Sequence, residues 1–148
     1  MKVSTKGEYT LRAMLELAQS YKKGPLTIKE IGERQVISVY YLEQLFSKVR
    51  RAKLVESIRG PHGGYKLARN PGKITVGDIL RVAEGSLAPV TCLDECPEVR
   101  KKCKFSRNCI ARLMWRELYS KMQEVFGRTT LQDLLEKGRA DGIRTGLA

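Results

Sequence analysis

Hydrophobic residues recur at helical spacing through the first fifty residues of the chain. Over residues 5–22 they return every three to four positions, which predicts an amphipathic helix ended by a Gly-Pro pair. Thr27 and Glu30 have the spacing of a capping box, so a short second helix is expected to begin there. Ser38 is a suitable N-cap for a third helix, whose four apolar residues have the i, i+3, i+4, i+7 spacing of a buried stripe.

The pattern then changes to that of short strands. Residues 54–59 and 65–68 are strand-like and are joined by a Gly-rich turn, which predicts a β-hairpin. A further capped helix follows from Thr75 to Ala83. This order of elements is that of a winged helix-turn-helix. The predicted fold class is therefore mainly α with a small β-hairpin: a winged helix-turn-helix DNA-binding domain over residues 1–85, plus a long dimerisation helix.

The second half of the chain divides into three segments. Residues 86–107 hold two prolines, three cysteines and many charges, and are expected to form a loop without regular secondary structure. Residues 108–137 are expected to hold the long helix, to about residue 126, and a short C-terminal helix after Thr130; residues 138–148 are expected to be a mobile tail. The long helix has an apolar face made of Ile110, Leu113, Met114, Leu118, Met122 and Val125.

That apolar face has little left within one chain to cover it. We expect it to pack against a second copy of the chain in a homodimer; the alternative is that it packs back onto the winged helix-turn-helix. The N-terminus has no uninterrupted apolar segment, and nowhere do about 18 apolar residues run together. The sequence therefore predicts a cytoplasmic protein with no membrane partner.

Charge indicates what the predicted domain binds. The 148 residues include 28 Lys and Arg against 16 Asp and Glu, a formal net charge of +12. A chain this basic attracts polyanions, and nucleic acid is the commonest of them; the alternative is an ordinary basic surface. We expect double-stranded DNA, as a promoter operator, to be the partner.

The third helix and the hairpin supply the expected DNA contacts. In a helix-turn-helix the second helix of the motif enters the major groove, and a wing reaches the adjacent minor groove. There Gln44 can pair with adenine and Glu43 can accept a hydrogen bond from cytosine, while Arg59 suits the minor groove. The basic residues farther along the helix suit phosphates, and the two tyrosines are expected to be exposed on the same face. The predicted DNA-binding residues are Tyr40, Tyr41, Glu43, Gln44, Lys48, Arg50, Arg51 and Arg59.

All four cysteines fall between residues 92 and 109, in the pattern C-x3-C-x6-C-x5-C. In a reducing compartment this clustering predicts metal or redox chemistry rather than structural disulfides. The pattern lacks the paired C-x2-C of structural zinc sites, and thiolates on a loop beside a helix also suit an iron–sulfur cluster. Spacing alone leaves zinc and iron–sulfur open. The chain has one histidine and no evident nucleophile–base pair, so we expect no enzyme and no small-molecule substrate.

Three stretches resemble the IscR and NsrR family of iron–sulfur regulators: KGEYTLRAMLELA, ISVYYLEQLFSKVRRAKLVESIRGPHGGYKLAR and CIARLMW. The resemblance spans residues 1 to about 135. It implies a homodimeric winged-helix transcription regulator that senses iron–sulfur cluster status and controls cluster biogenesis genes. The alternatives are a nitric-oxide- or redox-sensing repressor of the same family, and a zinc- or thiol-dependent regulator without a cluster.

The resemblance also implies a ligand set. The three cysteine ligands it implies are Cys92, Cys103 and Cys109, which leaves Cys96 as a surplus cysteine. The histidine ligand of IscR corresponds to Arg112, which stays protonated and cannot bind metal. In the NsrR branch an acidic residue of the other subunit takes that place, and the matching residue is Glu8, with Cys96 as the alternative. The IscR likeness implies a 2Fe–2S cluster, while a carboxylate ligand also fits 4Fe–4S members.

Overall fold

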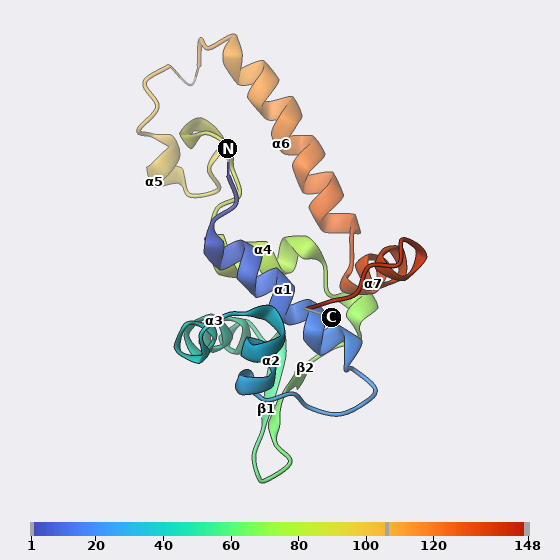
Figure 1. Ribbon diagram of the computed structural model, residues 1–148. Helices are drawn as coiled ribbons and strands as arrows, with labels where there is room; N and C mark the ends of the chain where they lie inside the picture. Colours follow the sequence, from blue (N-terminus) through green and yellow to red (C-terminus); the bar gives the residue numbers. More distant parts are fainter. Residues whose placement is uncertain (1, 106, 147–148) are drawn as a thin grey trace.

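The computed structural model describes residues 2–105 and 107–146. Its secondary structure is helical apart from one two-stranded antiparallel hairpin, as predicted (Figure 1). The helices are α1 (Thr5–Gln19), α2 (Ile28–Gln35), α3 (Val39–Arg51), α4 (Val76–Glu84), α5 (Pro97–Arg100), α6 (Ala111–Arg128) and α7 (Leu131–Ala140). The 3₁₀ turns are η1 (Pro71–Lys73) and η2 (Thr91–Leu93), and the strands are β1 (Val55–Ile58) and β2 (Gly64–Leu67).

Side-chain caps fix where several helices begin. At the start of α2 the Thr27 side chain accepts from the backbone N–H of Glu30 at 3.1 Å, and the N–H of Thr27 donates to the Glu30 carboxylate at 2.7 Å. Helices α4 and α7 begin with the same capping box, and Ser38 caps α3. These caps are local patterns of three or four residues, so the sequence predicted those of α2, α3 and α4; for α7 it predicted only a start after Thr130.

Some predicted boundaries differ from the structure. Helix α1 ends at Gln19 rather than at residue 22, because a turn closed by the Lys23 N–H and the Ser20 carbonyl follows it. The segment predicted to lack regular structure contains η2 and α5, the latter started by Pro97 at its first position. Helix α6 runs from Ala111 to Arg128, shifted from the predicted residues 108–126.

Buried side chains of α1, α2, α3, the hairpin, α4 and α7 form one core. Its largest fully buried apolar members are Phe46, Met14, Leu17, Ile31, Leu42, Ile74, Ile79 and Leu131. The rings of Phe46 and Tyr65 meet edge to face with centroids 4.8 Å apart, which joins α3 to the hairpin. Tyr65 also exchanges two backbone hydrogen bonds with Leu26, at 2.7 and 2.9 Å, so the segment before α2 lies beside β2.

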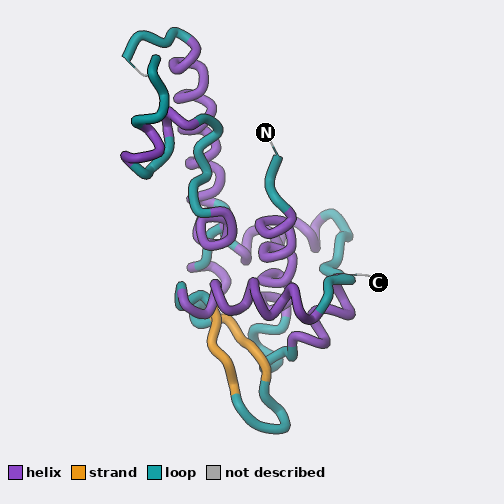
Figure 2. Tube along the Cα trace, turned by 90° about the vertical axis from the view of Figure 1, so that its left-hand side faces the viewer, coloured by secondary structure: helices purple, strands orange, loops and turns teal. Residues whose placement is uncertain are grey.

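Helix α6 has two different environments along its length. Its C-terminal half lies on α4, where a Cβ on Gly77 would be 3.2 Å from the Phe126 carbonyl oxygen and the Val76 N–H donates to Thr129 at 2.8 Å. Its N-terminal half extends away from the core on the same side as the segment that holds η2 and α5, and it contacts η2 (Figures 1 and 2). There Tyr119 is buried and donates to Glu95 at 3.2 Å. Burial first, and then this carboxylate, raise the pKa of Tyr119.

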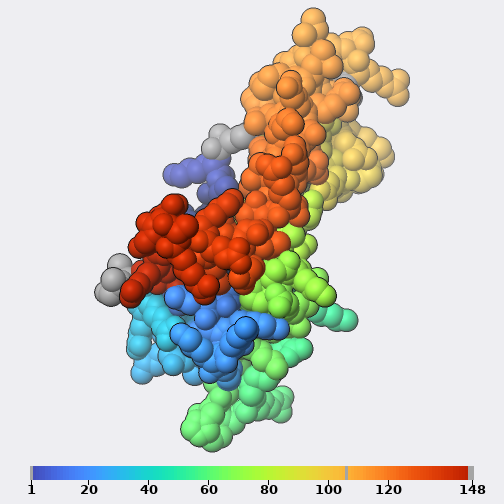
Figure 3. Space-filling view, turned by 90° about the vertical axis from the view of Figure 1, so that its right-hand side faces the viewer, coloured from blue at the N-terminus to red at the C-terminus, as the bar shows by residue number. Residues whose placement is uncertain are grey.

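The chain after α6 returns to α1. Helix α7 continues through Gly138 to Ala140, so these residues are helical rather than part of a tail. Residues 141–146 then pass beside α1 (Figure 3), and the Thr145 hydroxyl donates to the Gln19 side chain. Residues 147 and 148 of the predicted tail lie outside the described residues. Mobility of this segment stays a prediction.

The α2 capping box predicts an acid-dependent loss of stability. The backbone hydrogen bond from Thr27, and then its hydroxyl, lower the pKa of Glu30. A carboxyl with a lowered folded pKa stabilises the fold above its unfolded pKa of about 4.3 and loses that contribution as pH falls through its folded value. Urea unfolding between pH 6 and about pH 2 should therefore show a steeper loss for the natural chain than for Glu30→Gln. Parallel curves for the two proteins would contradict this role of Glu30.

Candidate nucleic-acid interface and cysteine segment

One face of α3 carries exposed polar, aromatic and cationic side chains. Tyr40 is 73% exposed, and Gln44, Lys48 and Arg51 follow it at helical spacing of four, four and three residues. Glu43 and Arg50 are exposed beside them. The opposite face is the buried stripe that was predicted for this helix. Helix α3 therefore presents a continuous row of side chains of suitable length and chemistry for base edges and phosphates.

Tyr41 lies differently from the expectation. It is half-buried, and its ring meets that of Tyr9 on α1 edge to face with centroids 5.9 Å apart. The guanidinium of Arg12 lies 5.3 Å from the centroid of the same Tyr9 ring. Tyr41 therefore fixes α3 against α1, and only its uncovered part is available for a DNA contact.

The hairpin projects from the same end of the molecule as α3, away from α5 and the start of α6 (Figures 1 and 2). Its strands pair in register from Val55 opposite Leu67 to Ile58 opposite Gly64. Arg59 follows β1 directly and is exposed in the connecting turn. A long cationic side chain at the tip of such a hairpin suits a narrow minor groove.

The hairpin glycines serve the hairpin itself. A Cβ on Gly63 would lie 2.1 Å from the Ile58 carbonyl oxygen, and one on Gly64 would lie 2.4 Å from that of Leu26. Gly64 also has a φ of +146°, which side chains rarely allow. The small size of these glycines is therefore required by the neighbouring backbone.

A buried polar network holds the turn between α2 and α3. Glu16 of α1 is 1% exposed and accepts from the Gln35 amide at 2.5 Å, and Arg34 lies 3.4 Å from its other oxygen. Arg12 donates to the Gln35 side chain at 2.8 Å and to its backbone carbonyl at 2.5 Å. Val36 then turns the chain with a φ of +55°. The network sets the position of the α3 start relative to α1, and sequence reasoning missed it.

The cysteines line the segment that precedes α6. Cys92 is buried in η2, Cys96 is exposed before α5, and Cys103 and Cys109 are half-buried. Among residues 2–105 and 107–146, no group of three or more His, Cys, Asp or Glu side chains lies close enough to hold a metal ion. Glu8 lies on α1, with an exposed carboxylate 3.9 Å from Arg12. The single chain therefore does not bring the four predicted ligands together.

The cysteine segment is nevertheless tied to α6. The Arg100 guanidinium donates to the backbone carbonyls of Asp94 and Glu95 at 3.0 and 3.2 Å. A hydrogen bond from Ser86, and then one from the Cys96 N–H, lower the pKa of Asp94. Glu95 in turn accepts from Tyr119 of α6. This hydrogen bond joins the cysteine segment to α6.

Comparison with known proteins identifies the family. The model for Rrf2, described as an iron-dependent transcriptional regulator, matches residues 3–137. This chain belongs to the Rrf2 family. The transcriptional regulator CymR of Bacillus subtilis (strain 168) is 44% identical over 135 residues, which cover 90% of this chain and 89% of CymR.

Solved structures of Rrf2 relatives have the same fold. The structure of B. subtilis CymR, described as a global cysteine regulator, aligns with a TM-score of 0.77 and 41% identity over 93% of this chain and 98% of that one. The T. potens IscR structure aligns with a TM-score of 0.79 and 40% identity over 99% and 94% of the two chains. The protein is therefore a DNA-binding transcription regulator with a winged-helix fold, and not an enzyme. In the part of the chain that is described, no helix has the length and apolarity needed to cross a membrane.

Two substitutions on α3 separate base reading from phosphate binding. On the DNA sequence that this Rrf2 protein selects from a random pool, Gln44→Ala should weaken binding by about 5- to 150-fold and relax the preference at one position, since it removes the amide that we predict to pair with adenine. Lys48→Gln should weaken binding to all sequences alike and reduce the slope of log affinity against log salt by about 1. Fluorescence anisotropy at several salt concentrations measures both. An unchanged base preference in Gln44→Ala would exclude Gln44 as a reader.

Proposed function

We propose that this protein is a homodimeric transcription regulator whose operator binding responds to an iron–sulfur cluster held by Cys92, Cys103 and Cys109. The observation that carries the proposal is the position of the thiols. All four cysteines of the chain lie within residues 92–109, directly before α6, in a member of a family described as iron-dependent. The IscR likeness supports cluster biogenesis genes as the target.

The homodimer is supported by the exposed face of α6. Ile110 is 86% exposed, Leu113 61%, Met114 51% and Val125 47%, although all are apolar. Exposed apolar side chains gathered on a projecting helix usually mark a contact with protein, although Leu118 and Met122 of the predicted face are half-buried against the chain itself. A second copy of α6 is the simplest partner, because a twofold axis pairs the same face with itself. Such a dimer presents two α3 helices to two operator half-sites.

The donor set fits a cluster by chemistry but is not assembled within one chain. Thiolates are the usual ligands of iron–sulfur clusters. Since the described residues do not converge, binding requires the segment before α6 to rearrange, a ligand from the second subunit, or both. The exposed Glu8 carboxylate is available for such a contribution across the dimer. When bound, the cluster supplies a group sensitive to iron and to oxidation; the link from Glu95 to Tyr119 carries a change in the segment to α6.

A second candidate function is regulation of cysteine genes without a cluster. It is favoured by the 44% identity to CymR, whose solved structure is described as that of a global cysteine regulator. In this case the thiols of the segment, and Cys96 in particular because it is exposed, respond directly to redox or metal ions.

Anaerobic reconstitution with ferrous iron and sulfide distinguishes the two functions. We expect iron and sulfide to be incorporated with characteristic ultraviolet–visible and EPR spectra, and operator affinity to differ between the loaded and unloaded protein. Replacing Cys92, Cys103 and Cys109 with Ala should abolish incorporation, because thiolate ligands are lost. The control Cys96→Ala should retain it. Zinc without iron would contradict the cluster proposal and favour the second candidate, whereas iron and sulfide retained by the triple variant would exclude these three cysteines as the ligands.

A further inference from the structure

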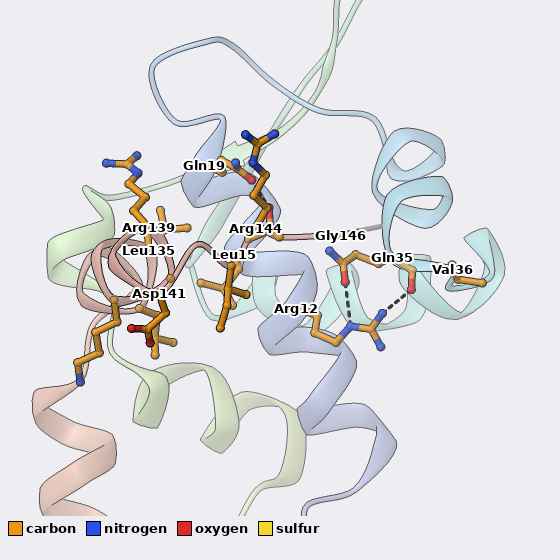
Figure 4. A pocket seen from close by; sticks show the side chains of 15 residues that line it. Arg12, Leu15, Gln19, Gln35, Val36, Leu135, Arg139, Asp141, Arg144 and Gly146 are labelled. Atoms are coloured by element: carbon orange, nitrogen blue, oxygen red, sulfur yellow. Dashed lines mark hydrogen bonds between the residues drawn. The ribbon is translucent and has the colours of Figure 1, made fainter. Parts of the chain in front are cut away.

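One cavity of the described chain lies outside both the DNA-facing surface and the cysteine segment. It has a volume of about 910 Å³ and lies between α1, the α2–α3 turn, α7 and residues 141–146 (Figure 4). This volume falls in the range of small-molecule sites, about 300–1,000 Å³. Neither the operator contacts nor the proposed cluster makes use of it.

The C-terminal residues close one side of the cavity. The Ile143 N–H donates to the Gly138 carbonyl at 2.7 Å, which turns the chain back after α7. The Thr145 hydroxyl then donates to Gln19 of α1. A Cβ on Gly146 would lie 2.9 Å from Glu16 and 3.1 Å from the Arg34 carbonyl oxygen, so only glycine fits there without a shift. The wall is thus held at both ends.

The lining is strongly cationic. Four basic side chains and one acidic side chain line the cavity: Arg12, Lys137, Arg139, Arg144 and Asp141. Arg12 is already engaged by Gln35, but within residues 2–105 and 107–146 neither Arg139 nor Arg144 forms an ion pair. Figure 4 shows both guanidinium groups extending to the same side of the cavity, Arg144 near Gln19 and Arg139 farther from it, with Asp141 on the other side. This arrangement favours an anion.

The rest of the lining is apolar. Leu15 of α1, Leu134 and Leu135 of α7, and Ile143 contribute aliphatic side chains. Leu135 is buried and Ile143 is 66% exposed, so the apolar surface extends from the core to the edge of the cavity. An inorganic anion would leave this surface exposed to water. A ligand with an aliphatic body would cover it.

We propose that this cavity binds a small organic anion, with its carboxylate at Arg139 and Arg144 and its aliphatic body over Leu15, Leu135 and Ile143. The planar guanidinium groups match a carboxylate with paired hydrogen bonds. The site is distinct from the proposed cluster site and does not depend on it.

The site also borders the DNA-reading motif. Arg12, Gln35 and Val36 line its inner end, and these residues hold the α2–α3 turn. A ligand that binds one arrangement of this turn more tightly than another can change operator affinity only by the ratio of its two affinities, typically about 5- to 150-fold.

Octanoate is a suitable probe, because it joins one carboxylate to a short aliphatic chain. Octanamide has the same chain without the charge and serves as the control ligand. For the full-length protein we expect octanoate to bind with a Kd of about 1 mM, as its ten heavy atoms allow, and octanamide to bind at least about tenfold more weakly. Isothermal titration calorimetry measures both. Equal binding of the two, or no saturable octanoate binding up to roughly 10 mM, would overturn the proposal.

A matched pair of double variants tests the location. Arg139→Gln with Arg144→Gln should weaken octanoate binding by about tenfold, whereas Arg116→Gln with Arg128→Gln, which removes the same charge from α6, should leave it unchanged. Methyl NMR should show shifts of Leu15, Leu135 and Ile143 on octanoate addition. Shifts confined to α6, or equal loss of binding in both double variants, would overturn the site. Both double variants keep all the cysteines. Absence of octanoate binding would therefore say nothing against the iron–sulfur reconstitution.

Discussion

Replacing Leu113 and Met114 together with Glu is expected to convert the protein to a monomer and to lower operator affinity by about a hundredfold or more. Both side chains are more than half exposed in the single chain, so the substitutions remove little from its own core. In a dimer through α6 they would place four carboxylates in an apolar interface without partners, which is strongly unfavourable. Once the subunits separate, each α3 binds its half-site alone, and the gain from simultaneous binding is lost.

Sedimentation and operator titration measure the two effects. The control replaces Lys73 with Glu, which changes the charge by the same amount at an exposed position outside α6. Surface substitutions away from an interface cost little, so this control should remain dimeric. Circular dichroism confirms that each chain is folded. A folded Glu variant that stays dimeric would show that α6 does not form the interface.

Local patterns made much of this fold predictable from the sequence. A capping box requires only residues three apart, and the buried stripe of α3 is a periodicity within one helix, so both could be identified without knowledge of the tertiary structure. The two strands and the order of elements followed from the same kind of pattern. Helix ends were less accurate, because they depend on turns such as the one after Gln19.

Long-range contacts account for what the sequence did not show. Tyr41 has the spacing of an exposed residue, but Tyr9 of another helix covers part of it. The burial of Glu16 depends on Gln35, nineteen residues away, and a Glu within an amphipathic helix gives no sign of such a partner. In the candidate cluster site the clustering of the cysteines predicts thiolate ligands, but whether they converge depends on how the segment folds and on the second subunit.

The second large effect is expected at the contact between α3 and the hairpin. Phe46→Ala should lower the free energy of unfolding by about 3–5 kcal/mol, because it removes a ring that is 1% exposed and leaves a cavity in the core. The edge-to-face contact with Tyr65 adds about 0.5–1.5 kcal/mol to what burial alone supplies. Urea unfolding of the variant, with the exposed neighbour Ser47→Ala as control, measures the loss. A loss below about 1 kcal/mol would contradict the structure at this position.

The same substitution should also loosen the hairpin from α3, the two elements that are predicted to contact DNA. Phe46 lies beneath the reading face of α3 and holds Tyr65 of β2, so its removal frees the hairpin to move relative to that helix. Under conditions where the variant is folded, its loss of operator affinity should come more from the predicted minor-groove contact of Arg59 than from the predicted base contact of Gln44. Combining Phe46→Ala with Arg59→Ala should therefore weaken operator binding by less than the product of the two single effects. Strict additivity would show that the hairpin keeps its position without Phe46.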